Sequence, residues 1–338
     1  MTTTTTTTIP TTNTTPMLQG AFTALVTPFT PTGDLDESAF RGLLIRQLEA
    51  GIDGLVPCGT TGESPTLSQE ERDRLIDLTI ETVRAHDATG RTLVVAGTGT
   101  NDTRATIAAT RRAAILGADA ALVVAPYYNK PDQRMLEAHY RAIADEGDLP
   151  VVVYNVPGRT GTNVAADTLM RLAEHPRIVA VKEASSNLEQ IMTILRDRPT
   201  GFAVLSGDDS WTLPVLGLGG DGVISVASNQ VPGTMVELCR AAREDDWTTA
   251  RAIHERYLDL FRVNFISPNP VPVKASLAEL GLISDVLRQP LLPLEHSQRA
   301  RGREAMAAVG LTATTSTSPT TTTPATRAAT TDGVTATA

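Results

Sequence analysis

Lys182 is the side chain whose setting most clearly suggests covalent chemistry. The chain holds only three lysines, and Lys182 lies inside the apolar run Ile178–Glu183 (IVAVKE). A charged amine is costly to bury, so burial favours the neutral form, which is the nucleophile that condenses with a ketone to give a Schiff base. A salt bridge to the neighbouring acid Glu183 would explain a buried lysine equally well, and the residue alone does not decide between the two.

Tyrosines supply a second candidate group. The chain has five, and Tyr127, Tyr128 and Tyr154 fall at the ends of expected strands. Tyr154 lies in the run VVVYNVPGRTG, one strand before Lys182. A phenol there can transfer protons to and from a reacting amine adduct, although aromatic packing is the usual role of a strand tyrosine.

Two further features could hold carboxylates. The segment Gly59–Glu63 (GTTGE) combines glycines with the hydroxyls of Thr60 and Thr61, and such a loop can bind a carboxylate through N–H and O–H groups. Arg159 comes just after the fifth expected strand, the run that holds Tyr154, and a guanidinium can bind a second carboxylate through two hydrogen bonds. An ordinary turn and a solvated arginine are the simpler readings.

Eight short apolar runs are the elements that must position these groups. Most are continuously apolar, as expected for parallel strands covered on both faces. They are Phe22–Phe29, Asp53–Gly59, Thr92–Gly97, Ala120–Pro126, Val151–Val156, Ile178–Glu183, Phe202–Ser206 and Gly222–Val226.

Helical segments alternate with these runs. Ser68 and Glu71 form a capping-box pattern, and the stripe Leu188, Ile191, Met192, Leu195 is typical of a helix packed on a sheet. Further helix starts are expected at Asp36, Asp102 and Asp132, and helix ends at Gly51, Gly117 and Gly147.

Eight strand–helix units predict a (β/α)8 TIM barrel with a C-terminal helical extension. A doubly wound open sheet is the rival, but no GxGxxG follows the first strand, and the glycine-rich segment 217–222 precedes a strand. In a barrel, the reactive groups are expected at the carboxyl ends of the strands.

Composition predicts which parts of the chain fold and to which class of protein it belongs. We expect disordered Thr-rich tails at 1–16 and 312–338, the barrel at 17–231 and C-terminal helices at 232–311. With 41% hydrophobic and 20% charged residues, the 338-residue chain has the composition of a soluble globular protein. No apolar run is long enough for a membrane span, and the N-terminus does not resemble a signal peptide.

Charge and cysteine content argue against several classes of partner. A net charge of −9 argues against nucleic acid and acidic membranes. The two cysteines, Cys58 and Cys239, form no CxxC pair and no metal-ligand cluster with histidine. We therefore expect no structural metal or disulfide framework, and a cytoplasmic location.

Several motifs, in order, resemble those of the dihydrodipicolinate synthase family. The resemblance runs from about residue 20 to 308, and the GTTGE loop and the lysine are shared with the wider pyruvate-dependent Schiff-base aldolase/lyase superfamily. The motifs are GTTGES (59–64), PYYNKP (126–131), YNVPGRTG (154–161), VKEAS (181–185), SGDD (206–209), GVISV (222–226) and PNPVPVK (268–274).

The resemblance implies a 4-hydroxy-tetrahydrodipicolinate synthase that joins pyruvate to L-aspartate 4-semialdehyde in the diaminopimelate route to lysine, without a metal or organic cofactor. Lys182 would form the pyruvate imine, and Tyr154 would exchange protons with it through Thr60 and Tyr128. Tyr128 would come from the adjacent subunit of a homotetramer built as a dimer of dimers.

Binding of the two substrates is implied in the same way. Thr61 and the backbone around Ile224 would hold pyruvate, and Arg159 would bind the carboxylate of the semialdehyde.

The effector pocket of lysine-inhibited relatives is matched only in part. Asn101 and Tyr127 fit the responsive pattern, whereas Gln69, Arg72 and Ala105 replace histidines and a glutamate. Loss of the acid removes a partner for the ammonium group of lysine, so we expect weak or absent feedback inhibition.

Two alternatives remain open. Another pyruvate-linked aldolase, such as an N-acetylneuraminate or 2-keto-3-deoxy-sugar-acid lyase, would share Lys182, Tyr154 and the GTTGE loop; Arg159 and the segment PNPVPVK favour the synthase. A non-catalytic barrel that binds a keto acid is the second alternative, but it would need no proton relay.

Overall fold

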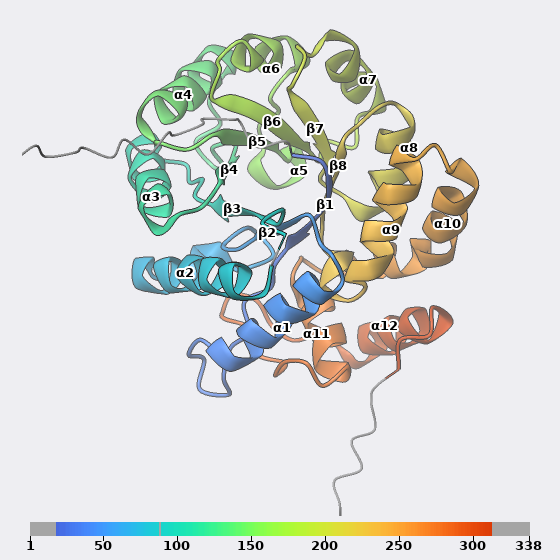
Figure 1. Ribbon diagram of the computed structural model, residues 1–338. Coiled ribbons are helices and arrows are strands. Elements are labelled where there is room, and N and C mark those ends of the chain that lie inside the picture. The colour runs from blue at the N-terminus through green and yellow to red at the C-terminus, as the bar shows by residue number, and fades with distance from the viewer. Residues whose placement is uncertain (1–17, 88, 313–338) are drawn as a thin grey trace, which may run out of the picture.

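The computed structural model describes residues 18–87 and 89–312. Eight strands form the centre and helices surround them, as seen along the barrel in Figure 1. The Thr-rich tails lie outside the described residues, except for residue 312. Within the described part of the chain, no helix is both long and apolar enough to cross a membrane.

The strands close into a fully parallel barrel, which confirms the predicted fold class. Each strand pairs with the next in sequence, and β8 pairs with β1. The strands are β1 (Gly20–Ala24), β2 (Gly54–Val56), β3 (Leu93–Gly97), β4 (Ala120–Val124), β5 (Val151–Asn155), β6 (Ile178–Glu183), β7 (Ala203–Ser206) and β8 (Gly222–Ser225).

Most strands end one to five residues before the apolar runs do. The largest difference is at β1, which ends at Ala24 although the apolar run continues to Phe29. The residues after Ala24 stay buried because they pack beneath the loops at the mouth of the barrel. Hydrophobicity therefore marked what is buried rather than what is hydrogen-bonded as a strand.

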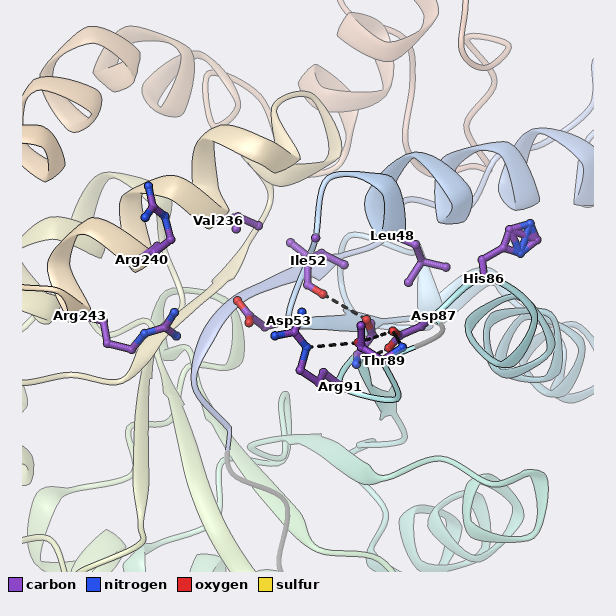
Figure 2. Close-up of a pocket in the computed structure, with 12 residues that line it drawn as sticks. Leu48, Ile52, Asp53, His86, Asp87, Thr89, Arg91, Val236, Arg240 and Arg243 are labelled. Atoms are coloured by element: carbon purple, nitrogen blue, oxygen red, sulfur yellow. Dashed lines mark hydrogen bonds between the residues drawn. The ribbon is translucent and has the colours of Figure 1, made fainter.

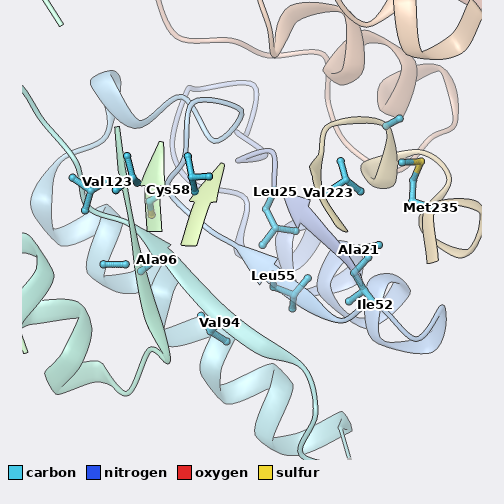
Figure 3. Close-up of a cluster of buried hydrophobic side chains, with 14 of the residues drawn as sticks. Ala21, Leu25, Ile52, Leu55, Cys58, Val94, Ala96, Val123, Val223 and Met235 are labelled. Atoms are coloured by element: carbon cyan, nitrogen blue, oxygen red, sulfur yellow. The ribbon is translucent and has the colours of Figure 1, made fainter. Parts of the chain in front are cut away.

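Alternation along each strand divides the apolar residues into two layers. One set, which includes Phe22, Val56, Val152, Tyr154 and Ile224, fills the barrel interior. The other set faces the surrounding helices, and part of it is drawn in Figure 3. Because both faces are covered, the strands read as continuous apolar runs.

The helices largely follow the expected alternation. Side chains of Asp36, Asp102 and Asp132 cap helix starts, and the capping box of Ser68 and Glu71 is present. The helices are α1 (Glu37–Glu49), α2 (Gln69–His86), α3 (Thr103–Leu116), α4 (Gln133–Glu146), α5 (Pro157–Thr160), α6 (Ala166–Ala173), α7 (Leu188–Asp197), α8 (Thr212–Gly217), α9 (Pro232–Arg243), α10 (Trp247–Val263), α11 (Val271–Glu279) and α12 (His296–Ala308).

The predicted apolar stripe of α7 is wrong in part. Ile191 and Ile194 are buried against the barrel, but Leu188 and Met192 are exposed. At 100° per residue, the helix cannot turn both pairs toward the same surface once Ile194 faces the sheet.

The C-terminal region has two parts. Helix α9 packs against β1 and β8, where it covers the last strand, whereas α10, α11 and α12 pack outside the ring (Figure 1). The predicted division at residue 231 stays a prediction; by its contacts, α9 belongs with the barrel layer. Helix α11 is the part of the extension that reaches the mouth, because its face packs on Val26 and Val226.

Candidate active site

Lys182 and Tyr154 lie side by side in the barrel interior. Lys182 on β6 is paired in register with Tyr154 on β5, and Lys182 Nζ lies 4.4 Å from the centre of the Tyr154 ring. The two side chains are 4% and 6% exposed. Gly207 makes room beside them, since a Cβ there would lie 3.2 Å from Lys182 Cγ and 2.6 Å from Ala184 Cβ.

Glu183 is not the partner of Lys182, and the salt-bridge interpretation of this lysine is wrong. Side chains of adjacent strand residues point to opposite faces, so Glu183 faces outward. Its carboxylate accepts hydrogen bonds from Asn155 Nδ2 (3.0 Å), the Ser185 backbone N–H (2.7 Å) and Gln190 Nε2 (3.3 Å). Burial raises the pKa of Glu183, and these donors act against the shift.

The amine of Lys182 therefore stands apart from acids. Among the residues that the structure describes, no carboxylate lies within 4.0 Å of it. The face of the Tyr154 ring lies beside it. An ion pair therefore does not account for the burial of this lysine, and its amine has the setting that a nucleophile requires.

A cavity of about 210 Å³ lies at the mouth of the barrel, where Thr60 and Arg159 both line it. Lys182 and Tyr154 do not line it, but Val156, which does, belongs to the same interior cluster as Tyr154. Arg159 is exposed and lies on the short helix α5, whose N-terminal turn follows β5 directly. The structure thus brings one hydroxyl and one guanidinium, predicted from separate motifs, to a single cavity.

The GTTGE loop is held in an unusual backbone conformation. Cys58 before it and Glu63 at its end have positive φ values of 59° and 54°. Such conformations cost on the order of 1–3 kcal/mol each and persist only when their surroundings fix them. Gly97, at the end of β3, lets that strand approach the start of the loop closely, because a Cβ on Gly97 would lie 2.3 Å from the Cys58 carbonyl oxygen.

The C-terminal extension fixes the other end of that loop. Lys274 on α11 donates to Glu63 Oε1 at 2.6 Å and to the Thr27 carbonyl at 2.9 Å, and the backbone N–H of Arg288 donates to Glu63 Oε2 at 3.0 Å. Burial lowers the pKa of Lys274, and the Glu63 charge opposes that shift. In addition, Asn269 Nδ2 donates to Thr61 Oγ1 at 2.9 Å.

The segment after β8 is fixed by a buried acid. Asp209 Oδ2 accepts from the backbone N–H groups of Val226 (3.1 Å) and Ala227 (2.8 Å), two residues beyond Ile224. Burial raises the pKa of Asp209 to about 6. Ile224 itself is buried in the interior and is paired in register with Phe22 on β1.

Tyr128 is a predicted site residue that lies on the surface, away from the other candidate groups of its own chain. Its side chain is 89% exposed, and its backbone has a φ of 73°. It projects from the loop after β4 and does not line the mouth cavity, whereas its neighbour Tyr127 does.

A larger hollow of about 410 Å³ lies at the opposite end of the barrel (Figure 2). Asp53 and Arg91 precede strands β2 and β3, and Arg240 and Arg243 come from the last turn of α9. Since barrel enzymes act at the carboxyl ends of their strands, the smaller cavity at the mouth is the candidate active site.

Sequence reasoning did not single out Asn269, Lys274 or Asp209, whose side chains hold the segments around the candidate site. Each lies within a motif that was noted, PNPVPVK or SGDD, but none stands near the reactive groups along the chain. Only the fold brings them to the GTTGE loop and to β8.

Fold and site together define a (β/α)8 barrel protein with a buried lysine beside a tyrosine in its interior. The chain belongs to the Dihydrodipicolinate synthetase family, which it matches over residues 17–309.

Individual members of this family are similar to the chain over most of its length. The 4-hydroxy-tetrahydrodipicolinate synthase of Chloroherpeton thalassium is 50% identical over 295 residues, which cover 87% of this chain and 96% of that protein. The crystal structure of dihydrodipicolinate synthase from Aquifex aeolicus is similar with a TM-score of 0.83 at 43% identity, covering 87% and 99% of the two chains. The enzyme of Cyanidioschyzon merolae, solved with lysine bound, gives a TM-score of 0.82 at 43% identity, covering 88% and 99%.

Proposed function

We propose that the chain is a 4-hydroxy-tetrahydrodipicolinate synthase that condenses pyruvate with L-aspartate 4-semialdehyde. Curated relatives of that name, about 50% identical over most of the chain, support the activity. The observation that carries the residue assignment is the pairing of Lys182 with Tyr154 inside the barrel.

In the first step, Lys182 Nζ attacks the C2 carbonyl of pyruvate. The carbinolamine loses water to give an imine, and loss of a C3 proton gives the enamine. Tyr154, at the side of the amine, exchanges these protons, and Thr60 and Tyr128 pass them toward solvent. Thr61 and the backbone near Ile224 hold the pyruvate carboxylate.

In the second step, the enamine carbon attacks the aldehyde carbon of the semialdehyde, whose oxygen takes up a proton and becomes the 4-hydroxyl group. The substrate amine then attacks the imine carbon, closes the six-membered ring and expels the Lys182 amine. Arg159 binds the semialdehyde carboxylate at the cavity mouth, where a guanidinium can form two charge-assisted hydrogen bonds.

Reduction by borohydride tests the covalent step. We expect pyruvate plus borohydride to inactivate the enzyme and to add the mass of reduced pyruvate to the peptide that contains Lys182. Modification elsewhere, or none, would reject Lys182 as the nucleophile and would favour a keto-acid-binding barrel.

Substrate assays separate the synthase from the sugar-acid lyases. We expect turnover of pyruvate with L-aspartate 4-semialdehyde and none with N-acetylneuraminate or 2-keto-3-deoxy sugar acids. Turnover of only the sugar acids would replace the proposed function with that of the related aldolases.

Exposure of Tyr128 supports an assembly in which this side chain serves the adjacent subunit of a homotetramer. Mixing two inactive variants, Lys182→Ala and Tyr128→Phe, after dissociation tests this. A mixed dimer would contain one site with intact Lys182 and a partner's intact tyrosine, so activity should return. If Tyr128 serves its own subunit, the mixture stays inactive.

Feedback and location complete the proposal. We propose weak or absent inhibition by L-lysine: Gln69 bonds to Asp73 and Arg72 to the Ser64 carbonyl, and neither offers an acid to an ammonium group. Strong inhibition of the purified enzyme by L-lysine would contradict this proposal.

The two cysteines are buried and unpaired, which supports a cytoplasmic location.

A further inference from the structure

The hydroxyl of Thr61 has an unexpected partner from the far end of the chain. Asn269, just before α11, donates from Nδ2 to Thr61 Oγ1 at 2.9 Å, across 208 residues of sequence. Both side chains are buried. The contact is therefore shielded from water and fixed by tertiary structure alone.

The direction of this hydrogen bond determines what the threonine can do. A hydroxyl has one hydrogen to donate and two lone pairs that accept. Because the asparagine amide occupies a lone pair, the hydroxyl hydrogen remains available, and among the described residues Thr61 Oγ1 donates no hydrogen bond. A free donor in a buried loop suits a carboxylate, which accepts only.

The distance between the two segments is set by a separate buried contact. Lys274, one turn into α11, pairs with Glu63 at 2.6 Å, two residues beyond Thr61. Phe29 lies beneath, with Lys274 Nζ and the Arg288 guanidinium each 4.3 Å from its ring centre. Asn269 is thus held against the loop by a framework that does not depend on its own hydrogen bond.

We propose that Asn269 is a positioning residue for pyruvate binding, acting through Thr61. By donating to Thr61 Oγ1, it reserves the hydroxyl hydrogen for the pyruvate carboxylate. The inference rests on the proposed function and assigns to the C-terminal extension a part in binding the first substrate.

Pyruvate titration of borohydride inactivation tests this without the second substrate. In Asn269→Ala, we expect the half-saturating pyruvate concentration to rise roughly 3- to 10-fold, the range of one lost hydrogen bond. The KM for the semialdehyde should not change. In a Thr61→Val background, Asn269→Ala should cause no further rise, because the group through which it acts is gone.

Asn264→Ala is the matched control. Asn264 is also buried, donates from Nδ2 to a side-chain oxygen (Gln230 Oε1, 2.8 Å) and, like Asn269, has a buried Oδ1 without a partner in the described structure. It follows α10, away from the GTTGE loop. Its removal should leave pyruvate half-saturation at the wild-type value, although it carries the same structural cost.

Asn269→Asp covers the case in which Asn269→Ala does not fold. This variant keeps the shape of the side chain, but a carboxylate only accepts hydrogen bonds. The Thr61 hydroxyl must then donate to the new carboxylate instead of to pyruvate, so pyruvate half-saturation should rise more than in Asn269→Ala. The inference would be overturned if the folded Asn269 variants had the pyruvate half-saturation of the wild type. It would also be overturned if Asn269→Ala raised half-saturation as much in the Thr61→Val background as in the wild type, or if Asn264→Ala raised it as much as Asn269→Ala does. Failure to trap wild-type Lys182 would instead overturn the proposed function.

Discussion

Ionisable side chains are buried to different extents at the two ends of the barrel. At the mouth, Lys182, Glu63, Lys274 and Asp209 are all buried, and each has a defined neighbour within the fold. Desolvation is costly for such groups, and the fold tolerates it where the backbone of the GTTGE loop and of β8 must be fixed.

At the amino-terminal end, the arginines are exposed to water, whereas Asp53 is partly buried and its pKa is raised by burial. Arg91, Arg240 and Arg243 are exposed around an open hollow (Figure 2). Arg240 also pairs with the half-buried Glu237 and the exposed Glu244. That hollow is about 410 Å³ against about 210 Å³ at the mouth. Volume therefore does not locate the site; the carboxyl end of the strands, where the buried ionisable groups also gather, does.

Removing the reactive amine should have the largest effect. We expect Lys182→Ala to lower kcat by roughly 10⁴-fold or more, as loss of a covalent nucleophile does. Its circular dichroism should match that of the wild type, because the barrel closes without this side chain. Lys182→Arg, which keeps the charge but cannot form the imine, should be equally inactive; substantial activity in either variant would show that the mouth is not the covalent site.

The second-largest effect is expected from breaking the buried ion pair between Lys274 and Glu63. Lys274→Met leaves the Glu63 carboxylate buried without its counter-charge, held only by the Arg288 backbone N–H. The free energy of unfolding should therefore fall by about 3–5 kcal/mol in urea titrations. The double variant Glu63→Gln/Lys274→Met removes both charges and should recover most of that loss. If Arg240→Ala, which breaks an exposed pair at the other end, cost as much as Lys274→Met, the contrast between the two ends would not hold.

Asp209 predicts a pH dependence of stability. Its pKa is raised from 3.8 to about 6 by burial. The folded state therefore binds this proton more tightly than the unfolded state, and the resulting stabilisation is present below about pH 4 and lost as the pH rises through 6. It amounts to about 3 kcal/mol.

Comparison with Asp209→Asn isolates this contribution. The unfolding free energy of the wild type minus that of the variant should increase as the pH falls from 7 to 4. A pH-independent difference would show that Asp209 is not held at a raised pKa.

Arg159→Ala should affect one substrate. Loss of charge-assisted hydrogen bonds costs about 1.5–3 kcal/mol, so kcat/KM for the semialdehyde should fall roughly 10- to 150-fold. Pyruvate half-saturation in the borohydride titration should be unchanged. Equal losses for both substrates would place Arg159 outside the role proposed for it.

The smallest effect is expected at the amino-terminal hollow. Arg243→Ala removes an exposed guanidinium from it, and kcat/KM should stay within about twofold of wild type. A larger loss would mean that the larger hollow takes part in activity after all.

Sequence patterns were sufficient for the barrel and for the position of its reactive groups. Strand alternation placed Lys182 inside, and adjacency of β5 and β6 placed Tyr154 beside it, because parallel barrel strands pair in sequence order. Local patterns failed where neighbours decide: Leu188 and Met192 were expected in the core, yet the docking angle of α7 leaves them exposed.

The sequence by itself determined the (β/α)8 order, the apolar strand around Lys182 and the caps of the helices, since all of these depend on residues close together along the chain. Only the tertiary structure decided that Glu63 pairs with Lys274, 211 residues away, and that Asn269 donates to Thr61. The physical reason is that hydrogen bonds act over about 3 Å in space, whatever the separation in sequence. Closure of the barrel and docking of α11 are what bring those atoms together.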